Sequence, residues 1–329
     1  MKIRSEFLKI FIFCIVIALM VCILLFKTIQ LKNFPEIQYG TDYLQRFNII
    51  LPKKNNNVYA VIYFHGGGFS GGNKLNYPLF LKDFSDNNIF ATVGYRLIKK
   101  DQIGTESAVT MDDIIADVDA ALFKIFDYSK ERGINIKGVI LAGHSAGGHI
   151  ALQYGYKYFM ENDNREIKIT ACVSLSGSTS FSDIFWSAMS DWGEDLEKRL
   201  ESFSWRITEL TSQNILIDQY NWIENNNWND YQEYINEITP ITFVERNHKI
   251  PPTLLVHALD DKCVPYNNAL KLSDALSSAS VQNKFITVTG RGNSHLLGGK
   301  SKSALKPFKI PNQPWVDETI EWIKTFLDC

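Results

Sequence analysis

A serine between two glycines, placed where an apolar run gives way to a helical pattern, restricts the fold of this 329-residue chain most strongly. Residues 143–147 read Gly-His-Ser-Ala-Gly and directly follow the apolar run at 138–142. A helix-compatible run begins at Ile150. The glycines permit a turn that is too tight for nearby Cβ atoms, so the pattern predicts a strand–turn–helix unit. Ser145 is then exposed at a helix N-terminus, where backbone N–H groups favour developing negative charge, and it is the candidate nucleophile.

Alternating apolar runs and helical patterns predict the architecture around this serine. Helical periodicity is clearest between Met111 and Ile125, where apolar residues recur at steps of three and four, and a second helical segment covers 315–327. Strands alternating with helices indicate an α/β fold, with a mostly parallel central sheet and helices on both faces. Six apolar runs read as strands: 58–64, 89–95, 138–142, 169–175, 253–259 and 285–288.

One segment, residues 181–238, interrupts this rhythm with patches of polar sequence and many large aromatic side chains. We expect a helical, aromatic-rich insert that caps the carboxyl edge of the sheet. Pockets favour aromatic linings, so these side chains could form a wall facing a substrate. A solvent-facing excursion with its own small core is an equal alternative. The segment holds five of the seven tryptophans: Trp186, Trp192, Trp205, Trp222 and Trp228.

The N-terminal region carries an apolar run at residues 10–26 that is near the length needed to cross a bilayer. Lys27 follows it with no small-x-small cleavage pattern, which favours an uncleaved anchor over a signal peptide. We therefore expect a membrane anchor and linker at 1–38 and a catalytic domain at 39–329. Basic residues before the span favour a cytoplasmic N-terminus and an extracytoplasmic catalytic domain: Lys2, Arg4 and Lys9.

Charge and cysteine content exclude several classes of protein. The chain has 34 Lys and Arg against 36 Asp and Glu, so no basic field is available to hold nucleic acid. Its five cysteines show neither the spacing of a disulfide framework nor that of a zinc site. We expect no metal and no organic cofactor, and the sequence leaves the oligomeric state open.

A glycine-rich loop follows the predicted strand at 58–64. It reads His-Gly-Gly-Gly at residues 65–68, and such a loop can aim backbone N–H groups at one oxyanion. The residue after the nucleophile, Ala146, supplies a further donor. A phosphate cradle is the rival interpretation, but the segment lacks the spacing of a phosphate-binding loop. The sequence therefore predicts an oxyanion hole.

A nucleophilic serine needs a base, and the base needs an orienting acid. In an α/β enzyme of this kind the acid and then the histidine follow the serine along the chain. His295 comes after the last predicted strand and is the candidate base. Asp260 and Asp261 both follow the strand at 253–259, and spacing alone does not choose between them. The other histidines fit scaffold positions better: His65, His144, His149, His248 and His257.

Together these residues resemble the α/β-hydrolase superfamily and, within it, the esterases that carry an HGGG motif. Those groups are the hormone-sensitive-lipase-like carboxylesterases, the bacterial feruloyl-esterase-like enzymes and the kynurenine formamidases. The resemblance runs from about residue 39 to the C-terminus. Besides His295, the matching segments are HGGGFSGG at 65–72, GYRL at 94–97, GHSAGGH at 143–149, TPITFV at 239–244 and DDKCVP at 260–265.

The resemblance implies the α/β-hydrolase fold and a set of site residues. The family pattern D-x-x-V-P selects Asp261 as the acid, and the family's oxyanion donors fall on Gly67, Gly68 and Ala146. With Ser145 and His295 this predicts a serine hydrolase that cleaves small-molecule carboxylic esters through an acyl-enzyme. An amidase or formamidase with the same triad, or a membrane-tethered binding protein without catalysis, are the alternatives.

Overall fold

The protein is described here by a computed structural model that covers eight stretches of the chain. The chain divides into two compact units, Met1–Glu36 and Ile37–Cys329, and the second unit carries the fold. Within the described stretches, no helix is both long enough and apolar enough to span a bilayer. The anchor predicted at 10–26 lies outside them and stays a prediction. The described stretches are 34–54, 56–161, 166–182, 196–212, 228–246, 249–289, 295–296 and 313–327.

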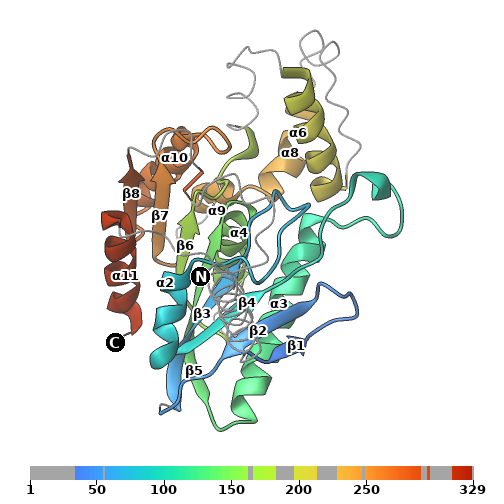
Figure 1. Cartoon of the computed structure of the whole chain (residues 1–329). Helices are drawn as coiled ribbons and strands as arrows, with labels where there is room; N and C mark the ends of the chain where they lie inside the picture. The colour runs from blue at the N-terminus through green and yellow to red at the C-terminus, as the bar shows by residue number, and fades with distance from the viewer. Residues whose placement is uncertain are drawn as a thin grey trace, which may run out of the picture. The chain divides into compact units, whose positions relative to one another are not determined.

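An eight-stranded sheet forms the centre of the second unit (Figure 1). Its strand order is β1-β2-β4-β3-β5-β6-β7-β8. In this order, all neighbouring strands from β4 through β3 and β5 to β8 pair in parallel, whereas β2 pairs with β4 antiparallel. The predicted α/β fold is confirmed. The strands are β1 (Glu36–Gln38), β2 (Arg46–Ile50), β3 (Asn57–Phe64), β4 (Ile89–Val93), β5 (Asn135–His144), β6 (Ile169–Leu175), β7 (Thr253–Ala258) and β8 (Asn283–Val288).

All six predicted strands are present, with ends shifted by a few residues. β4 ends at Val93 rather than at residue 95, and β5 begins three residues earlier than its apolar run. The sequence did not indicate β1 or β2. β1 is only three residues long, and in β2 buried Phe47 and Ile49 alternate with partly exposed neighbours. A very short strand or a short alternating strand gives a much weaker signal than a continuous apolar run.

Helices cover both faces of the sheet, as the sequence predicted. On β3, Ala60 and Ile62 belong to a core cluster shared with α3 (Met111–Lys130) and α4 (Ala146–Glu161). Val61 and Tyr63 face the opposite way, into a second cluster with α2 (Leu79–Lys82) and α11 (Pro314–Leu327). Because side chains alternate along a strand, this division shows that each face of the sheet has its own packed layer.

The insert between β6 and β7 contributes three described helices, α6 (Leu196–Thr211), α8 (Trp228–Glu237) and α9 (Pro240–Arg246). Helices α6 and α8 lie side by side beyond the carboxyl ends of the strands, where a cap was predicted (Figure 1). Ile207 of α6 and Ile235 of α8 join the main core cluster, and half-buried Trp205 packs against it. The described part of the insert therefore shares the core of the sheet. The side chains of the other four tryptophans lie outside the description.

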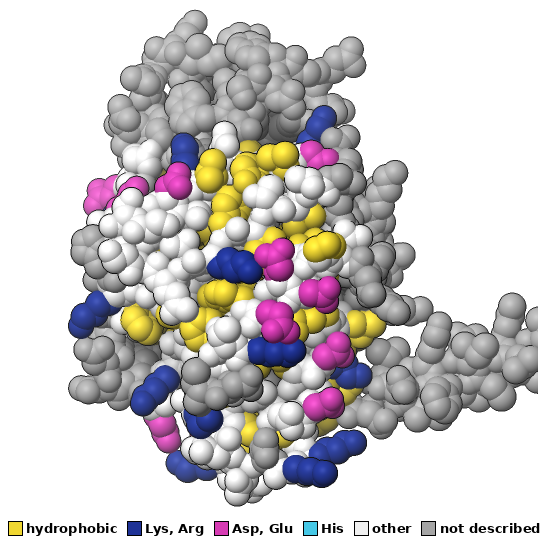
Figure 2. Space-filling model, turned by 90° about the vertical axis from the view of Figure 1, so that its left-hand side faces the viewer, with side chains coloured by type: hydrophobic (Ala, Val, Ile, Leu, Met, Phe, Trp, Pro, Cys, Tyr) yellow, Lys and Arg dark blue, Asp and Glu magenta, His cyan; other side chains and the backbone are white. Residues whose placement is uncertain are grey.

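The side of the molecule on which α11 and β8 lie carries mixed charge (Figure 2). Lys and Arg side chains alternate there with Asp and Glu side chains and small apolar areas. Two ion pairs are of this kind, Lys284 with Glu318 at 3.1 Å and Lys324 with Glu321 at 3.0 Å. Exposed pairs of this type add little to stability, so this face serves mainly as a solvated surface.

Candidate active site

The turn at Ser145 has the strand–turn–helix form that its glycines predict. β5 ends at His144 and α4 begins at Ala146, with Ser145 between them at a φ of 55°. The Ser145 N–H donates to the carbonyl of Leu175 at 2.9 Å, which ties the turn to β6. A Cβ added to Gly147 would lie 2.1 Å from the carbonyl oxygen of Phe64, so no side chain fits there. The side chain of Ser145 stays partly exposed at the carboxyl edge of the sheet.

The glycine-rich loop after β3 lies directly against this turn. A Cβ added to Gly66 would lie 3.1 Å from the Cβ of Ser145. Gly67 and Gly68 follow with positive φ values of 131° and 59°, conformations that favour glycine. The structure therefore places Gly66, the residue before the predicted oxyanion donors Gly67 and Gly68, beside the candidate nucleophile.

Tyr95 holds the start of this loop. Its hydroxyl donates to the carbonyl of His65 at 2.7 Å, and its ring stacks on the imidazole with centroids 4.4 Å apart. Burial lowers the pKa of His65 to about 4, so its ring is neutral at physiological pH. A neutral, stacked and fully buried imidazole is a structural element, and this agrees with the scaffold position expected for His65.

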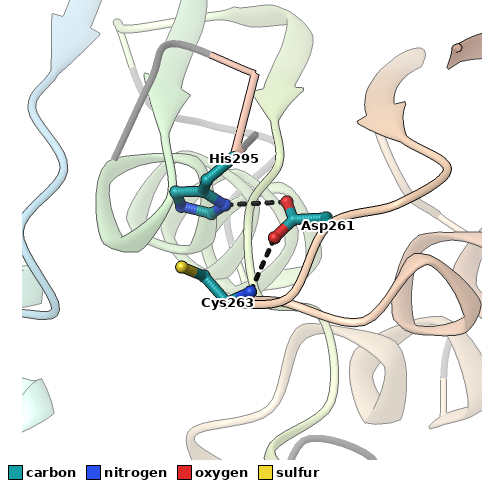
Figure 3. Close-up of side chains that lie close together, drawn as sticks. All are labelled: Asp261, Cys263 and His295. Atoms are coloured by element: carbon teal, nitrogen blue, oxygen red, sulfur yellow. Dashed lines mark hydrogen bonds and ion pairs between the residues drawn. The ribbon is translucent and has the colours of Figure 1, made fainter. Parts of the chain in front are cut away.

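His295 and Asp261 form a buried pair (Figure 3). The Nδ1 of His295 lies 2.7 Å from Oδ2 of Asp261, although the two residues are 34 positions apart. The other carboxylate oxygen, Oδ1, accepts the backbone N–H groups of Cys263 at 2.8 Å and Val264 at 3.0 Å. Of the two aspartates after β7, the one that contacts the histidine is thus the one selected by the D-x-x-V-P pattern.

Electrostatics keep this carboxylate ionised. Burial tends to raise the pKa of Asp261, but the hydrogen bond and charge of His295 outweigh it, and the pKa falls below its ordinary value. His257 adds a second partner, because its Nε2 lies 3.4 Å from Oδ2 while donating to the carbonyl of Val264 at 2.8 Å. Burial lowers the pKa of His257, so this ring is neutral. An ionised aspartate below a histidine is the arrangement that orients a general base.

His144 connects the turn to the histidine–aspartate pair. Its Nε2 donates to the backbone carbonyl of His295 at 3.3 Å, and the two ring centroids lie 4.6 Å apart. Burial, helped by the nearby His295, holds the pKa of His144 well below its ordinary value, so the ring stays neutral. The residue next to Ser145 therefore touches the residue that carries the candidate base. Sequence reasoning gave His144 no side-chain role, since the contact joins positions 151 residues apart.

Comparison with known protein families identifies the family of this chain. Residues 47–276 match the family model BD-FAE, which describes an α/β-hydrolase-type esterase family. The chain belongs to the BD-FAE family. Membership makes it a serine carboxylesterase-like hydrolase, as the resemblance of its motifs predicted. Comparison with curated protein sequences found no significant match.

Several solved structures share the fold of this BD-FAE chain. Esterase B from Lactobacillus rhamnosis has a TM-score of 0.61 at 17% identity, covering 89% of this chain and 84% of the other. A truncated carbohydrate esterase from gut microbiota has a TM-score of 0.60 at 16% identity, covering 88% and 94%. A thermophilic esterase from the Planctomycetes species Thermogutta terrifontis has a TM-score of 0.57 at 15% identity, covering 89% and 91%. At such identities these likenesses describe the fold alone.

The cap of this BD-FAE protein touches the glycine-rich loop through Arg206 of α6. The guanidinium donates from Nε to the carbonyl of Gly68 at 3.2 Å and from Nη2 to the hydroxyl of Ser70 at 3.3 Å. It also lies over the ring of Trp205, 4.4 Å from its centroid. The sequence did not predict a role for Arg206, because nothing in the pattern of a polar helix indicates a contact with the loop at Gly68 and Ser70.

His149 is part of the scaffold under the site. Its Nδ1 donates to the carbonyl of Ser178 at 2.9 Å, and its ring contacts the aromatic rings of Phe69 and Phe181. Burial lowers the pKa of His149 to about 4. The sixth histidine, His248, lies outside the described residues. Among the described histidines, His295 is the one whose Nδ1 faces a buried carboxylate.

Proposed function

We propose that this protein cleaves carboxylic esters through an acyl-enzyme on Ser145, with His295 as base and Asp261 as its orienting acid. The observation that carries the proposal is the 2.7 Å contact between His295 and Asp261, with His295 in contact with His144 in the turn that presents Ser145. Two proteins with the same fold are esterases that react with phosphorus-containing inhibitors, which supports the proposal. One structure of the Lactobacillus esterase is inhibited by a tributyrin phosphonate, and one of the Thermogutta esterase is phosphoramylated by tabun.

The first half of the reaction acylates the enzyme. His295 takes the proton of the Ser145 hydroxyl as the oxygen attacks the ester carbonyl, and the imidazolium then gives that proton to the leaving alcohol. Asp261 holds the Nδ1 proton and stabilises the imidazolium while it exists. In the second half, His295 activates a water that hydrolyses the acyl-enzyme and frees the serine. No step needs a metal or an organic cofactor.

The oxyanion formed in each half is accepted by backbone N–H groups of Gly67, Gly68 and Ala146 in this proposal. The first two belong to the loop that lies against Ser145, and Ala146 opens α4. Donors fixed in place before the reaction stabilise charge that develops only in the transition state. Loss of a single donor of this kind costs about 10²–10³ in rate.

Small acyl or aryl esters are the proposed substrates, including acetyl or feruloyl groups on sugars. Two fold relatives are described as a carbohydrate esterase from gut microbiota and a bifunctional GH43-CE protein from Bacteroides eggerthii. Hydrolysis of p-nitrophenyl acetate, of a feruloyl ester and of an N-formyl anilide by one preparation compares the ester and amide alternatives. Faster turnover of the anilide than of both esters would overturn the ester assignment.

Labelling with a fluorophosphonate probe tests the nucleophile and separates an enzyme from a binding protein. The wild-type chain is expected to label, and Ser145→Ala is expected to lose the label. Ser107→Ala is a matched control, because Ser107 is an exposed serine in the loop before α3 and has no part in the proposed mechanism. Absence of labelling in the wild type, or labelling that survives in Ser145→Ala, contradicts the proposal.

We also propose that residues 10–26 anchor the chain in a membrane, with the catalytic domain on the extracytoplasmic side. The support is the length of the apolar run and the basic residues that precede it. The full chain is expected to stay in the membrane fraction after carbonate washing, whereas a chain starting at residue 35 is released. Release of the full chain by carbonate would contradict the anchor, and protection of the catalytic domain from protease added outside intact cells would contradict its orientation.

A further inference from the structure

Cys263, a side chain that the ester mechanism does not use, forms a cluster with Asp261 and His295. One ligand atom from each of Asp261, Cys263 and His295 lies within 4.8 Å of the other two (Figure 3). The aspartate and the histidine are buried, whereas Cys263 is exposed. A carboxylate oxygen, an imidazole nitrogen and a thiol sulfur therefore meet at a point that is open to solvent on one side.

Local backbone structure holds two of these ligands together. The N–H groups of Cys263 and Val264 occupy Oδ1 of Asp261, which leaves Oδ2 facing His295. The same loop brings the sulfur of Cys263 within 4.8 Å of the ligand atoms of Asp261 and His295 (Figure 3). The cluster thus depends on the loop after β7, whose backbone N–H groups hold the carboxylate.

We propose that Asp261, Cys263 and His295 form a binding site for Zn²⁺ and that the bound ion inhibits the enzyme. Thiolate, imidazole and carboxylate are the three side-chain groups that bind Zn²⁺ in proteins, and three protein ligands leave a fourth position for water. A tetrahedral ion needs ligand atoms roughly 3.3–3.6 Å apart. The most distant ligand atoms, up to 4.8 Å apart, then have to approach by about 1 Å, and if Nδ1 of His295 and Oδ2 of Asp261 are both ligands, their 2.7 Å contact has to widen. Rotation of the exposed Cys263 side chain can supply most of that movement.

The bound ion inhibits ester hydrolysis because it changes the protonation of His295 or occupies its basic nitrogen. Binding releases the thiol proton of Cys263 to water, since the thiolate is the ligand. If Nδ1 of His295 binds the ion, its proton moves to Nε2, and the ring can no longer accept the proton of Ser145. If Nε2 binds instead, the lone pair that serves as the base is occupied. The inhibitory part of the inference rests on the proposed function, whereas metal binding itself does not.

Metal binding is tested first on the full chain carrying Ser145→Ala, which keeps all three ligands. Titration with Co²⁺, which accepts the same ligands as Zn²⁺, is expected to produce a thiolate charge-transfer absorption that Zn²⁺ abolishes. Adding Cys263→Ser is expected to remove this band and to weaken Zn²⁺ binding by at least about tenfold. Cys172→Ser is the matched control, because that buried cysteine lies in β6 away from the cluster. A band that is absent from the start, or one that survives Cys263→Ser, overturns the site.

Inhibition is tested second, on hydrolysis of p-nitrophenyl acetate by the chain with an intact serine. Zn²⁺ is expected to abolish turnover, Mg²⁺ is expected to have no effect, and a chelator is expected to restore the rate. Cys263→Ala is expected to need at least about tenfold more Zn²⁺ for half inhibition of its own metal-free rate. Equal sensitivity of the two proteins overturns the inhibitory role. A wild type without any hydrolysis contradicts the proposed function, and the Co²⁺ titration still decides the metal site.

Discussion

Replacing Asp261 with asparagine isolates the orienting function of the carboxylate. Oδ1 of Asp261 accepts two backbone N–H groups, from Cys263 and Val264, whereas Oδ2 faces Nδ1 of His295. In Asp261→Asn the amide oxygen stays with those two donors, because turning it round would break one buried and one partly buried hydrogen bond, and an unsatisfied buried donor costs about 1–3 kcal/mol. The amide NH₂ group then faces Nδ1 and forces that nitrogen to accept, which moves the ring proton to Nε2.

An imidazole with its proton on Nε2 cannot take the proton of Ser145. The corresponding asparagine variant of a serine protease triad loses about 10⁴ in kcat. We expect kcat to fall by about 10³–10⁴ here, which corresponds to about 4–5 kcal/mol of transition-state stabilisation. KM is expected to change little, because the side chain of Asp261 is fully buried below His295.

The assay is steady-state hydrolysis of p-nitrophenyl acetate at pH 7, with thermal unfolding to verify that the variant folds. Asp260→Asn is the control, because Asp260 is the adjacent aspartate and Asp261 is the one that pairs with His295. Its rate is expected to stay close to that of the wild type. A folded Asp261→Asn protein that keeps more than a tenth of the wild-type kcat would falsify the tautomer argument. A larger loss of kcat in Asp260→Asn than in Asp261→Asn would show that Asp260, and not Asp261, is the acid.

Three further predictions test the surroundings of the site. Gly147→Ala is expected to lower the free energy of unfolding by about 2 kcal/mol or more, because the added Cβ meets a carbonyl oxygen at 2.1 Å. Urea unfolding checks this against Gly71→Ala, whose Cβ has 3.7 Å of clearance, and equal losses would contradict it. Arg206→Met removes the contact of the cap with Gly68 and is expected to lower kcat/KM by about tenfold with little change in melting temperature, and an unchanged kcat/KM refutes this role. Burial lowers the pKa of His149 from 6.5 to about 4, so its contribution to stability is complete above pH 6.5 and is lost as the pH falls toward 4. Between pH 7 and pH 4 the free energy of unfolding, measured with urea, is expected to fall by up to about 3 kcal/mol less in His149→Asn than in the wild type. An equal fall in the two proteins would contradict the lowered pKa of His149.

The sequence predicted those parts of the site that depend on a few consecutive residues. The turn at Ser145 and the loop at Gly67 and Gly68 need glycines at fixed positions, because backbone atoms approach too closely for side chains. Such requirements are local, so they can be recognised from a few neighbouring residues in the sequence. The buried parallel strands were predicted for a related reason, since burial on both faces leaves a continuous apolar run. The anchor at 10–26 stays a prediction.

The sequence could not by itself identify contacts between residues that are distant in the chain. Spacing left Asp260 and Asp261 as alternatives, and family resemblance was needed to favour the second. His144 and Arg206 had no sequence pattern that indicated their partners. Cysteine spacing also gave no sign of a metal site, because the cluster of Cys263 includes a histidine 32 positions further along the chain.

Local chemistry in the sequence thus determined where a nucleophile and its oxyanion donors form. Only the tertiary structure decided that the Asp261 carboxylate meets His295, that His144 contacts the His295 backbone and that Cys263 lies close to both members of the pair. The physical reason is that parallel strands bring their carboxyl ends to one edge of the sheet. Side chains from loops far apart in the chain meet at that edge, and the order of residues along the chain does not record which of them come into contact.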